Sequence, residues 1–129
     1  MRKILVAEDN PVGRELVREI LEAEGYDVIE ACDGREALEK ILSTEPDLVL
    51  LDIQMPELDG FEVLRELRQH PRLLRRPIVA LTAYAMDGDA ERALAAGFDA
   101  YATKPIDVAK LSSQIRQWLD HTVENPAMQ

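Results

Sequence analysis

The sequence has one cysteine, no long apolar run and few positive charges, and each shortage excludes a class of protein. Cys32 is the one cysteine among 129 residues, so no disulfide can form within the chain. We expect Cys32 to fill core space in a protein of a reducing compartment. No apolar stretch approaches the roughly 20 residues that a membrane-spanning helix needs. The apolar start at residues 4–7 is too short for a signal peptide and meets Glu8 at once, which predicts a cytoplasmic protein without a membrane segment.

Acidic residues outnumber basic ones, with 25 Asp and Glu against 15 Lys and Arg, and the formal net charge is −10. Nucleic-acid binding requires Lys and Arg side chains that neutralise phosphates, so we expect no direct contact with nucleic acid. Solubility is the simplest explanation of the surplus carboxylates. The length suits one domain with a substantial core, and the chain has no repeat, low-complexity stretch or internal linker.

Short aliphatic runs alternate with segments of helical periodicity along most of the chain. The runs suit buried parallel strands, because they are too short for stand-alone helices. We expect a domain over residues 1–120, followed at residues 121–129 by a tail without this periodicity. The expected strands are residues 4–7, 27–31, 48–51, 78–81 and 100–103, and the expected helices are residues 12–24, 35–43, 60–69, about 87–97 and about 107–119.

Apolar spacing and capping residues support these helices. In the first helix Leu16, Ile20 and Leu21 are expected to share the buried face, and Asp107 is expected to cap the last helix. Five strands alternating with five helices predict an α/β fold, a (βα)5 doubly wound parallel sheet of the flavodoxin-like order 2-1-3-4-5. In that order the first and third strands are neighbours, and the crevice above their carboxyl ends is the expected site.

Polar residues directly follow four of the five predicted strands. Glu8 and Asp9 follow the first strand, Asp52 the third, Thr82 the fourth and Lys104 the fifth. Any one of them alone would be read as a turn or capping residue, but the predicted topology brings all of them to one edge. Three crowded carboxylates repel one another unless a cation compensates. Mg²⁺ is the expected cation, with Mn²⁺ as an alternative, because it takes carboxylate oxygens and retains waters.

The residues around these positions form five separated motifs. They read Val6-Ala7-Glu8-Asp9-Asn10, Leu50-Leu51-Asp52-Ile53-Gln54-Met55-Pro56, Asp59-Gly60, Leu81-Thr82-Ala83 and Lys104-Pro105. From about residue 3 to residue 119, the chain resembles the receiver domains of response regulators in bacterial two-component systems. The stretch from Leu81 to Met86 and the acidic pair resemble DivK-type single-domain regulators in particular, and receivers attached to hybrid histidine kinases look similar.

The resemblance implies a phosphoacceptor that takes a phosphoryl group onto Asp52. The donor would be a phosphohistidine on a sensor histidine kinase or a histidine phosphotransfer protein, and the chain would assist only its own phosphorylation and dephosphorylation. The metal would be held by Glu8, Asp9, Asp52 and the backbone carbonyl of Gln54. Glu8 is one methylene longer than the aspartate that is commonest in this family, so it would act mostly through a coordinated water.

Other residues are implied to respond to the phosphoryl group. Lys104 would pair with one phosphoryl oxygen, Thr82 would donate its hydroxyl to another, and Tyr101 would turn inward as a switch when Thr82 moves. An equally simple interpretation makes Tyr101 a half-buried strand aromatic. Tyr84 would border the site and slow dephosphorylation, and the Lys104-Pro105 bond is often cis in this family. The signalling face for a downstream protein would be the fourth helix, fifth strand and fifth helix of a monomer or weak dimer.

Three other interpretations use parts of the same pattern. A phosphatase of the haloacid-dehalogenase type needs a second Asp two residues after its nucleophile, where this chain has Gln54. A flavodoxin that holds a flavin phosphate needs backbone donors after the first strand, but residues 8–11 offer negative charge and a proline. A receiver-like scaffold that acts only through protein contacts stays open. Met1 and the missing output domain favour a stand-alone regulator, although a receiver excised from a hybrid histidine kinase would look the same.

Overall fold

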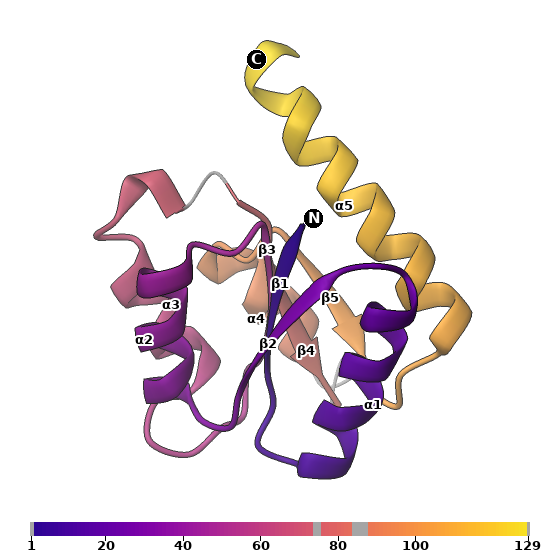
Figure 1. Ribbon diagram of the computed structural model, residues 1–129. Helices are drawn as coiled ribbons and strands as arrows, with labels where there is room; N and C mark the ends of the chain where they lie inside the picture. Colours follow the sequence, from indigo (N-terminus) through magenta and orange to yellow (C-terminus); the bar gives the residue numbers. More distant parts are fainter. Residues whose placement is uncertain (1, 74–75, 84–87, 129) are drawn as a thin grey trace.

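The computed structural model describes residues 2–73, 76–83 and 88–128, with side chains up to residue 120. Within these ranges the chain forms a single parallel sheet flanked by helices (Figure 1). The elements are β1 (Lys3–Ala7), α1 (Pro11–Ala23), β2 (Asp27–Ala31), α2 (Gly34–Thr44), β3 (Leu48–Asp52), α3 (Gly60–Leu67), the 3-10 helix η1 (Pro71–Leu73), β4 (Ile78–Thr82), α4 (Asp89–Ala96), β5 (Ala100–Thr103) and α5 (Val108–Met128).

The strand order is β2-β1-β3-β4-β5, and every neighbouring pair is parallel. The predicted fold class and strand order are therefore confirmed. In this register Ala7 lies beside Leu51, and Asp52 lies beside Leu81. The last residues of β1, β3, β4 and β5 thus meet at one edge of the sheet, where the sequence predicted the site.

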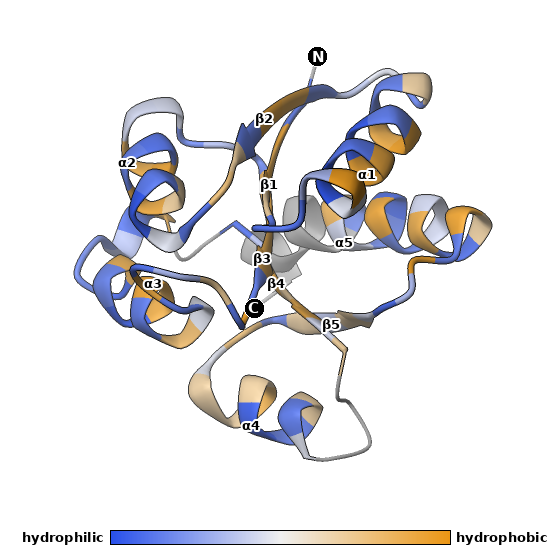
Figure 2. Ribbon diagram, turned by 90° about the horizontal axis from the view of Figure 1, so that it is seen from below, coloured by the Kyte–Doolittle hydropathy of each residue, from blue (hydrophilic) through white to orange (hydrophobic). Residues whose placement is uncertain are grey.

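Two apolar cores cover the two faces of the sheet. Leu5 and Ala7 of β1 pack with α2, α3 and α4, whereas Ile4 and Val6 pack with α1 and α5. Figure 2 shows α1 and α5 on one side of the sheet and α2 and α3 on the other. This alternation along β1 explains why its whole apolar run is buried. None of the described helices combines the length and apolarity that a membrane crossing requires.

Side-chain caps fix the loops at the carboxyl edge of the sheet. Asn10, Asp33, Asp59 and Asp107 each accept a hydrogen bond from a backbone N–H in the first turn of α1, α2, α3 and α5. At α3 the cap is reciprocal, because the Glu62 carboxylate accepts from the Asp59 N–H at 2.9 Å. The predicted cap at Asp107 is confirmed. These caps hold the loops that follow the strand ends without using the residues of the predicted site.

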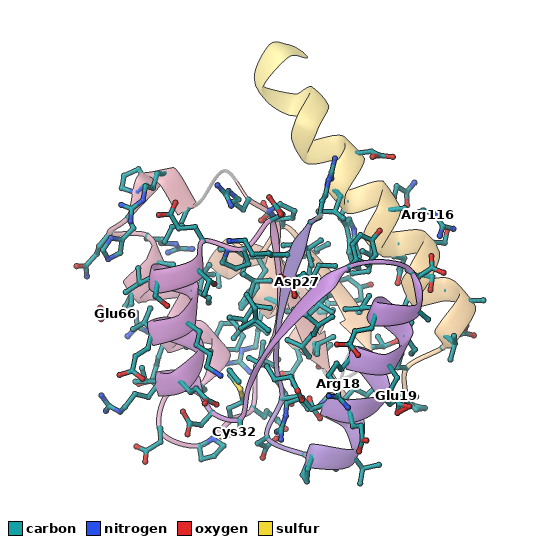
Figure 3. The ribbon with its side chains drawn as sticks, in the orientation of Figure 1. Arg18, Glu19, Asp27, Cys32, Glu66 and Arg116 are labelled. Atoms are coloured by element: carbon teal, nitrogen blue, oxygen red, sulfur yellow. The ribbon has the colours of Figure 1, made fainter. Side chains whose placement is uncertain are left out.

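Two burial predictions are wrong. Cys32 is exposed (Figure 3), because β2 is an edge strand that ends at Ala31 and the next side chain lies beyond the sheet. Leu16 is 43% exposed, since the buried stripe of α1 consists of Val17, Ile20 and Leu21. Leu16 lies at the edge of this stripe, on the side facing the turn before α5, where it lines a small pocket.

The last helix is longer than predicted. The backbone of α5 continues as a helix to Met128, past residue 120, and projects beyond the sheet (Figure 1). Residues 121–128 therefore continue the helix instead of starting a non-helical tail. The division into a domain of residues 1–120 and a separate tail stays a prediction.

Candidate functional site at the carboxyl ends of the strands

Three carboxylates lie together at the edge where β1 and β3 end. Glu8, Asp9 and Asp52 each offer an oxygen within 4.8 Å of the others. Glu8 and Asp52 are buried, with 5% and 3% of their surface exposed, whereas Asp9 is exposed. Asp52 ends a strand whose residues are all buried, which fixes its backbone in the core. The cluster thus has two sheltered carboxylates and one open to solvent.

Lys104, which follows the edge strand β5, contacts both buried carboxylates. Lys104 Nζ lies 2.5 Å from Asp52 Oδ2, 2.7 Å from Glu8 Oε2 and 2.9 Å from Glu8 Oε1. The backbone N–H of Lys104 donates to the Thr82 carbonyl at 2.9 Å, and the Lys104–Pro105 peptide bond is cis. The sequence analysis expected Lys104 to pair with a phosphoryl oxygen on Asp52 and did not foresee its contacts with Glu8. The strand order alone does not tell how far along the edge a flexible lysine will reach.

Burial sets the protonation behaviour of Glu8. Removal from water, reinforced by hydrogen bonding with Asp52, raises the pKa of Glu8 to about 7, even though Lys104 opposes this shift. Burial lowers the pKa of Lys104, but its hydrogen bonds to Asp52 and Glu8 outweigh that effect, so its pKa is raised overall. Two carboxylates therefore compete for one ammonium group, and the cluster lacks positive charge.

The donor set fits a divalent cation. Glu8 Oε2 is buried, and among the described residues no donor makes a well-directed hydrogen bond to it, although Lys104 Nζ lies 2.7 Å away. A buried carboxylate oxygen without a directed partner, close to two further carboxylates, is the hard oxygen environment that Mg²⁺ prefers. The Gln54 N–H donates to Asp52 Oδ1 at 2.9 Å, which places Gln54 beside the cluster. Coordination by the Gln54 carbonyl stays a prediction.

The other predicted residues lie at the ends of β4 and β5. Thr82 is the last residue of β4, is 1% exposed and lies beside Thr103, which precedes Lys104. Tyr101 lies in β5 and is 38% exposed, so it points outward in this structure. Tyr84 lies outside the described residues. Tyr101 also lines a groove of about 490 Å³ formed by α4, β5 and α5.

Glycines bring two helix starts against the site, a feature that the sequence analysis missed. A β-carbon at Gly60 would lie 2.7 Å from Ile53 Cα and 2.8 Å from the Asp52 carbonyl oxygen. A β-carbon at Gly13 would lie 3.1 Å from Glu8 Oε1. The start of α3 thus packs directly on the Asp52 backbone. The Asp59-Gly60 motif was the available signal, but by itself it indicates only a helix start.

Comparisons with known proteins point to one family. A family model described as the response regulator receiver domain matches residues 4–116. The polar-differentiation response regulator DivK of Brucella anthropi is 40% identical over 118 residues, which cover 92% of this chain and 96% of that protein. The receiver domain of a sensor histidine kinase from Pseudomonas aeruginosa, with a magnesium ion in its active-site cleft, matches with TM-score 0.86 and 37% identity, covering 92% of this chain and 98% of that one. A CheY-like receiver domain protein from Methanospirillum hungatei gives TM-score 0.87 and 31% identity over 97% and 98% of the two chains.

Proposed function

The chain belongs to the response regulator receiver domain family, and we propose that phosphorylation of Asp52 switches it to its signalling conformation. The observation that carries this assignment is the place of the Asp52 carboxylate. It is buried at the end of β3, within 4.8 Å of two other carboxylates, and Lys104 Nζ lies 2.5 Å from its Oδ2. An acidic nucleophile among cation ligands with a lysine beside it is suited to accept a phosphoryl group.

The transfer needs positioning and positive charge more than acid–base chemistry. An Asp52 carboxylate oxygen forms a bond to the phosphorus of a phosphohistidine as the P–N bond breaks. The electron pair of that bond stays on the imidazole nitrogen, which takes a proton from solvent. Membership of the family supports a histidine kinase or a histidine phosphotransfer protein as the donor. Lys104 would then exchange its contact with Asp52 for one with a phosphoryl oxygen.

Glu8, Asp9 and Asp52 would hold Mg²⁺ together with the Gln54 carbonyl, with Glu8 acting mostly through a water. When bound, the ion supplies positive charge to the phosphoryl oxygens. The magnesium in the cleft of the Pseudomonas aeruginosa receiver supports this choice of ion. Without the ion, Lys104 is the positive charge that neutralises Glu8 and Asp52.

The signal would leave the site through Thr82. Its hydroxyl would bond a phosphoryl oxygen, and the pull would shift the loop after β4 and let Tyr101 turn inward. Such a change is a shift between two populated conformations, biased by contacts that only one of them makes. The groove of α4, β5 and α5, which Tyr101 lines, would receive a downstream protein in the cytoplasm. In this proposal the chain turns over no external substrate, because Gln54 stands where a general acid would be needed.

Chemical trapping tests the assignment to Asp52. Borohydride reduces an acyl phosphate and converts the phosphorylated aspartate to homoserine, which peptide mapping locates by mass. After phosphorylation in Mg²⁺ we expect this conversion at position 52 alone. Conversion at Asp9 or at another carboxylate would reject Asp52 as the phosphoacceptor while leaving the family assignment intact.

A further inference from the structure

A second pocket lies between α3 and α4, away from the site at Asp52. Its volume is about 480 Å³, and its walls combine Arg65, Arg68 and Arg92 with apolar side chains such as Phe61 and Leu64. Figure 2 shows the two helices as neighbours beside the sheet. Because α3 begins against the Asp52 backbone, Arg65 and Arg68 lie at the far end of this helix from the site, whereas Arg92 of α4 contacts Phe61 near its start.

One of the three arginines contacts both an aromatic ring and a carboxylate. The Arg92 guanidinium carbon lies 4.9 Å from the centre of the Phe61 ring, and its NH1 donates to Asp89 Oδ1 at 3.0 Å. Phe61 is itself held edge-on by Phe98, with 5.9 Å between ring centres. These two contacts place the guanidinium beside the aromatic wall of the pocket, while 66% of the Arg92 side chain stays exposed.

The other two arginines form no ion pair with the described residues. Within the described ranges, no carboxylate lies at ion-pair distance from Arg65 or Arg68, although the chain carries a net charge of −10. A β-carbon at Gly97 would collide with the Arg68 guanidinium, so this group lies against the end of α4. Both side chains therefore border the pocket without an anionic partner in the part of the chain that the structure describes.

The residue type is informative. The three basic residues that line the pocket are all arginine. A solvated helix face needs only positive charge, which lysine supplies equally well. Arginine adds a planar fork of donors that fits two oxygens of a phosphate at once. A cluster of arginines beside an apolar wall fits a ligand that is part phosphate and part apolar.

We propose that the pocket between α3 and α4 binds a small organic phosphate of the nucleotide type. The forks of Arg65 and Arg68 hold the phosphate, and the wall that includes Leu64 and Ala95 takes the organic part. The volume lies within the range of about 300–1,000 Å³ typical of small-ligand sites. This site uses neither Asp52 nor a metal, and so goes beyond the phosphorylation switch.

The test is a titration of the ¹⁵N-labelled chain with ADP and with inorganic pyrophosphate, followed by NMR in EDTA. EDTA removes any cation that could draw phosphate to the acidic cluster. We expect saturable shifts at the backbone amides of α3 and α4, with ADP binding more tightly than pyrophosphate because only ADP has an organic part. Arg65→Ala/Arg68→Ala should weaken ADP binding by about tenfold or more, since each lost charged hydrogen bond costs about that factor.

Two further variants separate specific recognition from general charge. Arg18→Ala/Arg116→Ala removes the same number of charges from α1 and α5, on the other side of the sheet (Figure 3), and should bind ADP as the wild type does. Arg65→Lys/Arg68→Lys keeps the charge but loses the forks, and should bind several-fold more weakly. Thermal melts confirm that the variants fold.

Any of four results overturns the proposal. These are no saturable ADP binding to the folded wild type, equal affinity for pyrophosphate and ADP, equal loss of binding in the Arg18/Arg116 control, and shifts confined to the loops beside Asp52. Wild-type affinity in the double lysine variant would overturn the role of the guanidinium forks.

Discussion

Lys104 Nζ lies 2.5 Å from Asp52 Oδ2, and the same ammonium group donates to Glu8 at 2.9 Å. One side chain thus joins the carboxyl ends of β5, β3 and β1. Since Glu8 and Asp52 are both buried, Lys104 is their main source of positive charge when no metal is bound. In the metal-free chain Lys104 therefore neutralises the carboxylates that a bound metal ion would otherwise neutralise.

Removal of this ammonium group should destabilise the metal-free chain. For Lys104→Met we expect a loss of about 1–3 kcal/mol in the free energy of unfolding, less than for a fully buried pair because Lys104 is 27% exposed. Urea unfolding in EDTA measures it, and Lys110→Met, an exposed lysine of α5, is the control. The loss should shrink in saturating Mg²⁺. Equal losses for Lys104→Met and Lys110→Met would show that the pairing has no energetic weight.

Stability without metal should also depend on pH through Glu8. The pKa of Glu8 is raised from its ordinary value of 4.5 to about 7, so the folded chain keeps this proton to a higher pH than the unfolded chain. The resulting stabilisation is complete below pH 4.5 and is lost as the pH rises through 7, by an amount on the order of 3 kcal/mol.

Urea unfolding at pH 5 and pH 8 in EDTA measures this dependence. Glu8→Gln cannot ionise, so its stability should fall less over the same range, and the difference between the two slopes isolates Glu8. Parallel slopes would mean that the pKa of Glu8 is not raised in the folded chain. Mg²⁺ should remove most of the wild-type loss at pH 8, because the ion favours the ionised carboxylate.

The topology was predictable because the central strands β1, β3 and β4 are short, largely buried runs. The boundaries were predictable to within one residue, since Asp52 and Thr82 end their strands instead of following them. The convergence of Asp52, Thr82 and Lys104 followed from the strand order alone. Burial at the margins was not predictable. Cys32 and Leu16 are apolar by type, but their exposure depends on where the edge strand ends and on which stripe of α1 meets the sheet.

The pocket between α3 and α4 could not be predicted from the sequence, because its residues are far apart along the chain. Arg68 and Arg92 are 24 positions apart, and each alone is an ordinary surface arginine. Only the packing of α3 beside α4 places them around one cavity with Phe61. The close approach of Gly60 to the Asp52 backbone is likewise invisible in the sequence, because it depends on how α3 lies on β3.

Gly60→Ala should disturb the site through the backbone. The added β-carbon would lie 2.7 Å from Ile53 Cα, so α3 or the end of β3 must shift. We expect destabilisation by about 2–4 kcal/mol and weaker Mg²⁺ binding, measured by urea unfolding and by Mg²⁺ titration.

The control is Gly25→Ala, where the residue has φ +93° but an added β-carbon would meet no atom within 4 Å. It should cost about 1–2 kcal/mol through backbone strain and leave Mg²⁺ affinity unchanged. Unaltered Mg²⁺ affinity in a destabilised Gly60→Ala variant would show that the packing of α3 on β3 does not affect Mg²⁺ binding.

Thr82→Ala should separate phosphorylation from its consequence. Thr82 is buried at the end of β4, outside the carboxylate cluster, so the variant should still accept the phosphoryl group. Without the hydroxyl, Tyr101 should stay outward, and its ring signals in NMR should change little on phosphorylation, whereas Thr82→Ser should respond as the wild type does. A full Tyr101 response in Thr82→Ala would remove Thr82 from the switch.

The most direct test of the central claim is intact-mass spectrometry after incubation with acetyl phosphate, with Mg²⁺ or with EDTA, on the wild type and on Asp52→Asn. The account predicts one added phosphoryl group in the wild type with Mg²⁺ and none in the other three samples. A cognate phosphohistidine donor replaces acetyl phosphate if the small donor does not react. A folded wild type that gains no phosphoryl group from either donor and binds no Mg²⁺, or an Asp52→Asn variant that is phosphorylated as fully as the wild type, would contradict it.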